Sequence, residues 1–494
     1  MKTSMLLLGL LLAAVTVRAA DDLPPPRAVP QDGVEDLPPP RATSRKPRVV
    51  PADAAPATAT PATGAQPDVT APSDTASKDL PPPARSGKKP VARGFQPSMK
   101  AGIDDFLLEF GGLPDAPEAD TYSTFRTSAY VLWQPSREWE FRAGGRLDGM
   151  MQDGGLADHK EMLADYGDVY VRYRKGDSRL TVGTQTIIWG RADEIPLADR
   201  VSRADLTRFV LDDLPDRRRA QLAARWEQTL GDYKLDAVWL PILRGAQMPD
   251  VESVWNPINQ LTGKVLGIEP SPALDAFVKT ARIDEDEHGS GGGALRLTRT
   301  GEPFDFGMSL ARTRQSLPYY RVDAGSSLLT AVHPFNNFIG ADLELVRGGV
   351  TWRMELGYTE DVPVTLPSTS MAKTQSLDWI GAMEFFPGGK DTRINLQLVA
   401  HALQTDQSIL EMKEYYGANG EIETIFGNGR WKAGIRFFAG LNVHDVYINP
   451  RLGYVGWEPH ELYLSAHLFD GETQTLGGFH EDHSLITLGL RTRF

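Results

Sequence analysis

The chain has 494 residues, a net charge of −13 and no cysteine. The absence of thiols excludes disulfide scaffolds, thiolate metal sites and thiol catalysis, and an acidic balance without a basic domain argues against a nucleic-acid partner. A chain of this length would hold about three ordinary domains or one large β-structure.

The first nineteen residues have the composition of a secretory signal peptide. Lys2 precedes an apolar run from Met5 to Val17, and Ala19 and Ala20 provide small residues at a cleavage point. The run is shorter than a transmembrane helix. We therefore expect residues 1–19 to be removed and the rest of the chain to leave the cytoplasm.

Residues 20–97 are rich in Pro, Ala, Thr and Asp and nearly lack aromatic residues, which predicts a disordered periplasmic arm. The phrase Asp-Leu-Pro-Pro-Pro recurs at 22–27, 36–41 and 79–85, each time followed closely by arginine. Triple prolines favour the extended polyproline II form. The arm is either a spacer or a repeated docking motif for a periplasmic partner or the cell wall.

Residues 98–494 have a different sequence pattern. Segments of roughly ten residues alternate apolar and polar side chains, which is the period-2 signal of β-strands. An even number of such strands is what a bacterial outer-membrane barrel requires. The pattern predicts an all-β fold, a transmembrane antiparallel β-barrel of about 18 strands. The predicted strands are 103–110, 122–134, 138–149, 166–175, 178–189, 217–228, 231–240, 291–299, 302–312, 338–347, 349–360, 376–386, 391–402, 421–427, 430–439, 444–455, 460–469 and 484–494.

Two further features favour a barrel in the outer membrane of a Gram-negative cell, in contact with its lipid. Short turns alternate along the chain with connections at 150–165, 190–216, 241–290, 313–337, 361–375, 403–420 and 470–483, as periplasmic turns alternate with outer loops. Tryptophans at the ends of apolar faces predict two aromatic girdles. These tryptophans are Trp133, Trp139, Trp189, Trp226, Trp239, Trp352, Trp379 and Trp431.

The last strand closes the barrel by pairing with the first, because a membrane leaves no backbone group unpaired. Ile486, Leu488 and Leu490 share one face of this strand, and the chain ends on Phe494. This ending is similar to the signal by which the barrel-assembly machinery recognises outer-membrane proteins.

If the apolar residues face lipid, the charged residues between them line the lumen. Basic residues gather on the first and last strands, and acidic residues on the middle strands, so closure would set a basic arc against an acidic arc. No inward acid is expected on the last strands. The predicted basic residues are Arg126, Arg142, Arg146, Arg172, Arg174, Arg219, Arg225, Arg436, Arg491 and Arg493. The predicted acidic residues are Asp305, Asp342, Glu344, Glu355, Asp378 and Glu384.

The connection 190–216 is the best candidate for a constriction loop. Ser202 as N-cap, Asp205 three residues later and Pro215 as terminator predict a short helix. Asp205, Asp212 and Asp213 make it acidic, so it would narrow the pore if it folded against the arginines. The alternative is an ordinary outer helix packed on the rim.

Catalysis finds little support, since no hydrolase, metalloprotease or nucleotide-binding motif occurs. His480 and His483 stand close together in an outer connection without a partner motif, and the acidic segment 284–288 is either a solvated loop or a Ca²⁺ ligand set. We expect no enzyme activity, no cofactor and no metal.

The segment 180–226 resembles a family of large, poorly characterised Gram-negative outer-membrane proteins. The shared phrase stands here as Gly183, Gln185, Trp189 and Gly190, followed by an acidic loop with Asp212, Asp213, Asp216 and Arg217. More loosely, the architecture, size and lumen charge resemble the alginate export porin. Both resemblances imply a diffusion or export channel.

Two functions follow from these patterns. The first is an outer-membrane channel, a porin or export pore for anionic or polar solutes such as an exopolysaccharide. The second is a structural barrel that holds a periplasmic secretion or electron-transfer component. The split of lumen charge favours the first, and the proline-rich arm favours the second.

Overall fold

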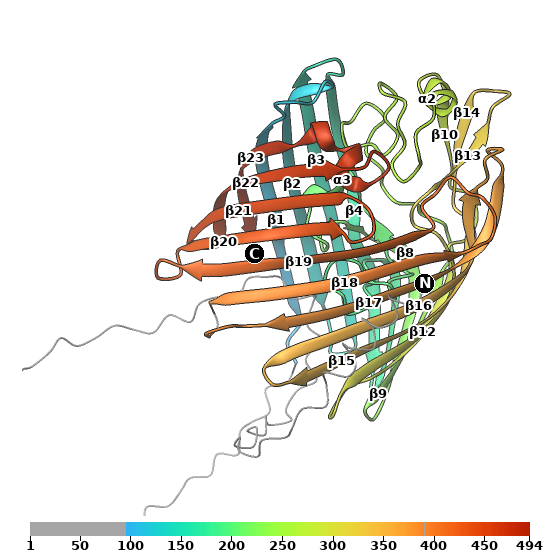
Figure 1. Ribbon diagram of the computed structural model, residues 1–494. Helices are drawn as coiled ribbons and strands as arrows, with labels where there is room; N and C mark the ends of the chain where they lie inside the picture. The colour runs from blue at the N-terminus through green and yellow to red at the C-terminus, as the bar shows by residue number, and fades with distance from the viewer. Residues whose placement is uncertain (1–94, 390) are drawn as a thin grey trace, which may run out of the picture. The chain divides into compact units, whose positions relative to one another are not determined.

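A computed structural model describes residues 95–389 and 391–494, so the expected signal peptide and most of the expected proline-rich arm lie outside the described residues. Eighteen strands form one antiparallel sheet that closes on itself (Figure 1), because the last strand, β23 (Leu485–Arg493), pairs with the first, β1 (Ser98–Gly112). The predicted antiparallel barrel of eighteen strands is confirmed.

Each of the eighteen predicted segments overlaps one barrel strand. The other barrel strands are β2 (Ala119–Gln134), β3 (Trp139–Gly154), β4 (His159–Lys175), β5 (Ser178–Gln185), β8 (Gln221–Leu230), β9 (Tyr233–Leu240), β11 (Gly292–Arg299), β12 (Asp305–Arg314), β15 (Phe335–Arg347), β16 (Val350–Thr365), β17 (Met371–Phe385), β18 (Thr392–Gln404), β19 (Glu414–Phe426), β20 (Trp431–Gly440), β21 (Asp445–Trp457) and β22 (His460–Gly471).

Several connections predicted to be long are short, because the strands that flank them continue past the predicted ends. The predicted connections 150–165, 361–375 and 403–420 shrink to 155–158, 366–370 and 405–413. Beyond the hydrocarbon layer no lipid imposes an apolar face, so these strand ends lack the period-2 pattern by which a strand is recognised. The connections that remain long are 186–220, 241–291, 315–334 and 472–484, each with small elements of its own.

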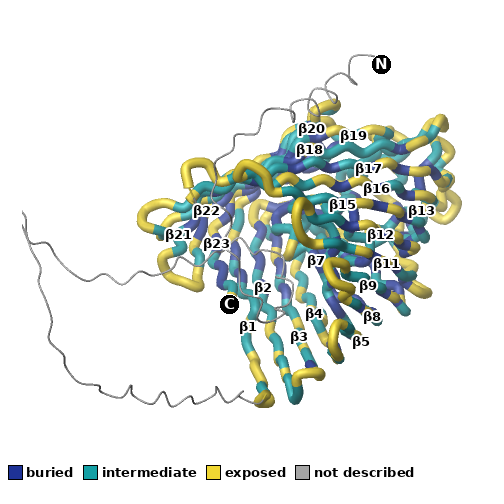
Figure 2. Tube along the Cα trace, turned by 90° about the horizontal axis from the view of Figure 1, so that it is seen from below, coloured by how far each residue is buried: buried dark blue, intermediate teal, exposed yellow. Residues whose placement is uncertain are grey.

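The strands present apolar side chains outward and polar side chains inward. On β4, Val169 and Val171 are 40% and 39% exposed, while Tyr170 between them is 9% exposed. Figure 2 shows buried and exposed positions alternating along the strands. Trp189 is an exception to the predicted girdles: it is 3% exposed and donates its indole N–H to Asp236 at 3.1 Å. The prediction was wrong because β5 ends at Gln185, which places Trp189 in the connection that follows.

The small elements all lie in the connections. Within the described residues, no helix is long and apolar enough to cross a membrane. The acidic segment 284–288 forms the exposed end of a rim strand and the residues after it. The small elements are β6 (Arg203–Ala204), η1 (Phe209–Leu211), β7 (Arg218–Arg219), α2 (Pro272–Val278), β10 (Arg282–Asp286), β13 (Tyr319–Asp323), β14 (Leu328–Val332), α3 (Leu476–Phe479) and η2 (Glu481–His483).

An apolar core connects two of the long connections to the barrel wall. Trp255, which is fully buried, packs in it with Val210 and Leu211 of η1 and with wall residues such as Tyr122 and Tyr447. Burying such large side chains stabilises the arrangement by about 2 kcal/mol each. This core holds part of the connection 186–220 against strands of the barrel.

Candidate functional site

The connection 186–220 is the candidate functional site, since it binds inward side chains on opposite walls of the barrel. One end lies against β15, β16 and β18. There Arg191 donates to Asp342 at 2.6 Å, and Asp193 accepts from Arg353 at 3.1 Å and Arg393 at 3.2 Å. These contacts tie the first turn of the connection to three strands.

The carboxylate of Glu355 on β16 is the most densely bonded anchor on this wall. It accepts the backbone N–H of Arg191, of Ala192 at 2.8 Å, of Leu197 at 2.7 Å and of Ala198 at 3.2 Å. Gly190 has φ +95° and lies so close that a Cβ there would stand 3.0 Å from Glu355. A glycine is therefore required at this turn, and Glu355, which is 1% exposed, is covered by the connection.

The other end of the connection binds strands at the seam where the barrel closes. Asp212 accepts from Arg126 of β2 at 2.8 Å, and the Asp213 carboxylate lies 3.5 Å from Arg436 of β20. Asp216 accepts from both arginines of β23. Its distances to Arg491 and Arg493 are 2.8 and 2.7 Å. The acidic side of the connection thus rests on an arginine wall.

The positions of these anchors show that the connection crosses the lumen. β2 and β16 are nine strands apart in either direction around the eighteen-strand barrel, so they lie on opposite walls. Inside the connection, Arg217 donates to Glu194 at 2.8 Å and Arg218 to Asp199 at 2.5 Å. These internal pairs brace the bridge between its two ends.

The helix predicted from Ser202 to Pro215 does not form. The structure has the short strand β6 followed by the single turn η1, and Phe209 has φ +47°. Asp205 accepts from the backbone N–H of Thr207 at 3.1 Å and from its hydroxyl at 2.5 Å. A local turn of this kind competes with a helix, and the ion pairs to the wall hold the segment as a series of turns.

Burial and ion pairing have opposite effects on the charge state of Asp212. Burial would raise the pKa of this carboxyl, but Arg126 and Arg208 outweigh burial and hold the pKa well below its usual range. Arg208 also donates to Glu109 of β1 at 2.5 Å. The four charges therefore form one buried network in which each ion is neutralised by a neighbour.

The ten predicted basic residues are interspersed with acids to a greater extent than the sequence pattern indicated. Each has an acidic neighbour, and several of these acids were not predicted. Those not described above pair as Arg142 with Asp104, Arg146 with Asp148 and Asp205, Arg172 and Arg174 with Glu140, Arg219 with Asp165, and Arg225 with Asp236 and Glu227. The last strands also carry inward acids, since Glu423 pairs with Lys432 and Glu461 with Arg451.

Four of the six predicted acidic residues pair with arginines, whereas Glu355 accepts backbone N–H groups and Asp378 contacts His401 and Ser376. Arg191 of the connection and Arg296 and Arg393 of the strands supply charges that the arc model omitted. Asp305 lies 3.7 Å from Arg191, and Glu384 accepts from Arg353 at 2.8 Å. The remaining partners are Arg191 and Arg296 for Asp342, Arg353 for Glu344, and His401 and Ser376 for Asp378. Pairing across neighbouring strands depends on register, which the sequence pattern alone did not fix.

The histidine cluster singled out in the sequence is sealed from solvent. His480 and His483 are 0% and 3% exposed, and their Nδ1 atoms lie 2.8 Å apart. His483 also contacts Glu118 at 3.1 Å. A hydrolytic or metal centre must be reached by its substrate or water, so this arrangement favours a structural role.

A closed barrel with an apolar outer face, a polar interior and paired strand edges is the architecture of outer-membrane β-barrel proteins. The described part of the chain is an outer-membrane β-barrel, in contact with lipid. No protein-family model and no curated protein matches its sequence.

Three solved structures illustrate what the chain is similar to. OccK5 (OpdH) of Pseudomonas aeruginosa has 10% sequence identity and a TM-score of 0.46, and the match covers 80% of this chain and 97% of that one. OccAB1 of Acinetobacter baumannii has 9% identity, coverage of 82% and 99%, and a TM-score of 0.47. An anion-selective porin of Comamonas acidovorans has 10% identity, coverage of 81% and 100%, and a TM-score of 0.38. With TM-scores below 0.5, these likenesses carry no weight for the function of the chain.

Proposed function

We propose that the barrel is an outer-membrane channel for anionic or polar solutes. The observation that carries the proposal is the bridge across the lumen from Glu355 to Arg126. An eighteen-strand barrel is too wide for side chains alone to fill, and a connection fixed across it leaves narrowed passages lined by polar groups. Asp205, Asp212 and Asp213 belong to this proposed constriction loop.

The preference for anions rests on partly exposed arginines near the rim with short turns. Glu140 is the shared partner of Arg172 and Arg174, at 2.7 and 3.9 Å. These two guanidinium groups are partly exposed toward the interior, as is that of Arg142. These guanidinium groups can be reached from the lumen, so a passing anion meets positively charged hydrogen-bond donors there.

An exopolysaccharide is the finer proposal for the solute. A chain of acidic sugars carries carboxylates and many hydroxyls, and closely spaced charge pairs such as Arg353 with Glu344 offer donors and acceptors for both. Blocking of the current by added uronic-acid oligosaccharides, with no effect of neutral oligosaccharides, would support this solute class. Equal effects of both would contradict it.

Planar-bilayer conductance of the purified chain tests the channel. We expect discrete conductance steps and a reversal potential in a salt gradient that favours anions. The absence of conductance at either polarity would contradict the open channel. The same measurement on a chain without residues 20–97 shows whether the arm affects the current.

The alternative function is a barrel that holds a periplasmic secretion or electron-transfer component. The three Asp-Leu-Pro-Pro-Pro repeats support it, because triple prolines form a stiff recognition element. Cross-linking from these repeats in intact cells would reveal a protein partner or the cell wall. A silent bilayer together with one specific cross-linked partner would favour this function over the channel.

We also infer that the barrel-assembly machinery recognises the last strand. Ile486 and Leu488 are exposed on the outer face of β23, and Phe494 ends the chain. Deleting Phe494 should lower the amount of folded barrel in the outer membrane, as measured by heat-modifiable mobility on gels. Unchanged assembly would contradict this role.

A further inference from the structure

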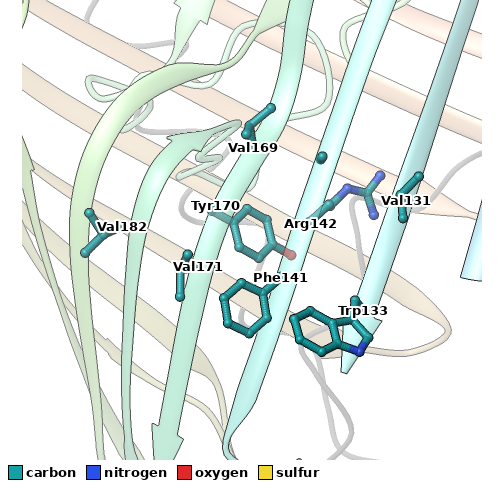
Figure 3. A pocket seen from close by; sticks show the side chains of 9 residues that line it. Val131, Trp133, Phe141, Arg142, Val169, Tyr170, Val171 and Val182 are labelled. Carbon is teal, nitrogen blue, oxygen red and sulfur yellow. The ribbon is translucent and has the colours of Figure 1, made fainter. Parts of the chain in front are cut away.

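A groove of about 310 Å³ lies in the outer face of the wall, across β2, β3, β4 and β5. Figure 3 shows the apolar side chains around it. Val131 and Trp133 come from β2, Phe141 from β3, and Val169 and Val171 from β4. Apart from Phe141, each is more than a third exposed, so the groove opens to the surroundings of the barrel rather than to its interior.

The pairing of the strands explains why the wall is hollow at this point. Ala143 of β3 pairs with Val131 on one side and with Val169 on the other. A single methyl group therefore stands between two larger side chains in the same row. The register shifts just beyond it, between Ala143 and Gly145, and such a bulge bends the strand locally.

The row nearer the turns is aromatic. Trp139 pairs with Tyr173 across β3 and β4, and their rings lie 4.8 Å apart. Trp133 and Phe141 also contact each other, with ring centroids 5.0 Å apart. Tryptophan and tyrosine are enriched at the level of lipid headgroups. The end of the groove nearer the short turns therefore lies at the membrane interface.

Two cations follow on the same face, directly beyond the aromatic row. Arg137 stands two residues before Trp139, and Lys175 two residues after Tyr173, and both are exposed. The bond from the Arg174 N–H to the Glu138 carbonyl, 2.8 Å long, extends the pairing into the turns. Because side chains alternate along paired strands, Arg137 and Lys175 lie side by side on the outer face.

Two acids share these turns, but they are placed differently. Glu138 is exposed, and its carboxylate is held within the turn, where it accepts from the Ser136 hydroxyl at 2.7 Å. Asp177 is exposed at the tip of the turn between β4 and β5. The outward row beneath the aromatic residues therefore presents two positive charges.

We propose that this surface binds one phospholipid of the periplasmic leaflet, with an acyl chain in the groove and the phosphate between Arg137 and Lys175. The inference rests on the position of the barrel in a membrane and not on its proposed transport function. In hydrocarbon the groove is filled by an acyl chain, since no water competes for it. The two cations attract an anionic headgroup at the interface.

Native mass spectrometry of the delipidated full chain, titrated with dioleoyl phosphatidylglycerol, tests the proposal. We expect one lipid to bind more tightly than the rest. The double substitution Arg137→Gln with Lys175→Gln should weaken that binding roughly tenfold, because each surface cation contributes to lipid affinity. Ala143→Phe should weaken it as well by filling the groove.

Matched controls come from another part of the wall. Ala341 of β15 also stands outward between larger side chains, Met308 and Leu356, and Arg347 ends the same strand at a turn. Ala341→Phe and Arg347→Gln should leave the tight lipid in place. Equal affinity of the parent and the double variant, or an equal loss in the controls, would overturn the proposal. The double variant changes only exposed turn residues, so its folding does not confuse the result, and its bilayer conductance should stay unchanged.

Discussion

Arg126 on β2 and Glu355 on β16 face each other from opposite walls, and both bind the connection 186–220. The first holds the connection through Asp212, the second through four backbone N–H groups. Each anchor is buried, and removing one partner of a buried ion pair typically costs about 3 to 5 kcal/mol. The bridge should therefore respond to single substitutions at either end.

Asp212→Asn removes the one negative charge that Arg126 and Arg208 share. We expect the seam end of the bridge to loosen, with larger single-channel conductance and more current fluctuation. Asp104→Asn is the control, because Asp104 pairs with Arg142 at a partly exposed position away from the bridge. Unchanged conductance in Asp212→Asn would show that the connection does not limit the current.

Glu355→Gln tests the other end at nearly constant side-chain volume. In this variant an amide NH₂ group, which is a donor, replaces a carboxylate oxygen that accepted backbone N–H groups, so those hydrogen bonds are lost. We therefore expect the free energy of local opening of residues 191–198 to fall by about 2 kcal/mol. Hydrogen exchange of these amides measures the change. Glu344→Gln serves for comparison, since Glu344 pairs with Arg353 on the neighbouring strand. The same exchange rates in both variants would contradict the anchoring role of Glu355.

Arg172→Gln should shift the reversal potential in a salt gradient toward weaker anion preference. The reason is that the partly exposed Arg172 guanidinium lies on an inward-facing position, so its removal lowers the positive charge along the lumen. Arg436→Gln acts differently, because Arg436 is buried and donates to the Val210 carbonyl at 2.6 Å. It should increase current fluctuation, as the loss of Asp212 does.

The outward-facing Arg347→Gln is the control for selectivity, since its charge faces away from the lumen. An anion preference that stays the same in Arg172→Gln would exclude Glu140 and its two arginines as the origin of selectivity.

The sequence predicted the barrel well, because lipid outside and polar groups inside impose a period of two on each strand. It failed where that constraint ends. The helix expected from Ser202 to Pro215 was wrong, since wall arginines and the turn at Asp205 outweigh local helix signals. The assignment of Trp189 to the girdle was also wrong, because its strand ends earlier than the alternating pattern suggests.

The inward charges were assigned to two separate arcs because alternation gives the face of a side chain but not its cross-strand neighbour. Glu140 is an example: it lies directly opposite Arg172 only through the register of β3 and β4. Arg191 and Asp193 belong to the bridge rather than to a strand, so no periodic pattern marked them. Their place in the dense run of charges after Gly190 was the only sequence signal.

The buried histidines join several connections to one another at the rim away from the short turns. The His480 ring lies 5.3 Å from Phe209 of η1, 5.4 Å from Trp255 and 5.6 Å from Phe469 of β22. His483 contacts Glu118, which also accepts from Asn259 at 2.7 Å. The charged or titratable groups nearest to His480 are thus His483 and, behind it, Glu118. Protonation of His480 would place a charge among aromatic rings.

Acid should therefore loosen these connections in a defined pH range. Burial, and to a lesser degree the nearby His483, hold the pKa of His480 well below its usual range. The ring therefore stays neutral in the closed cluster. When the cluster opens, the ring binds a proton below about pH 6.5. The closed cluster therefore loses stability as pH falls below about 6.5, by about 2 kcal/mol at pH 5. Burial would raise the pKa of Glu118, but hydrogen bonds from His483 and Asn259 lower it to about 2, so Glu118 adds its own loss only below about pH 4.5.

Hydrogen exchange of residues 250–260 at pH 7 and pH 5, corrected for the intrinsic pH dependence of exchange, measures this effect. We expect faster opening at pH 5 in the parent chain and no such difference in His480→Phe, which keeps an aromatic ring but cannot titrate. His444→Gln is the control, because His444 is exposed and pairs with Asp470 at the surface. If His480→Phe keeps the full pH dependence, another group controls the cluster. If the parent shows no dependence above pH 4.5, the buried ring does not couple the connections to pH, and the cluster is only a static link between the bridge and the rim.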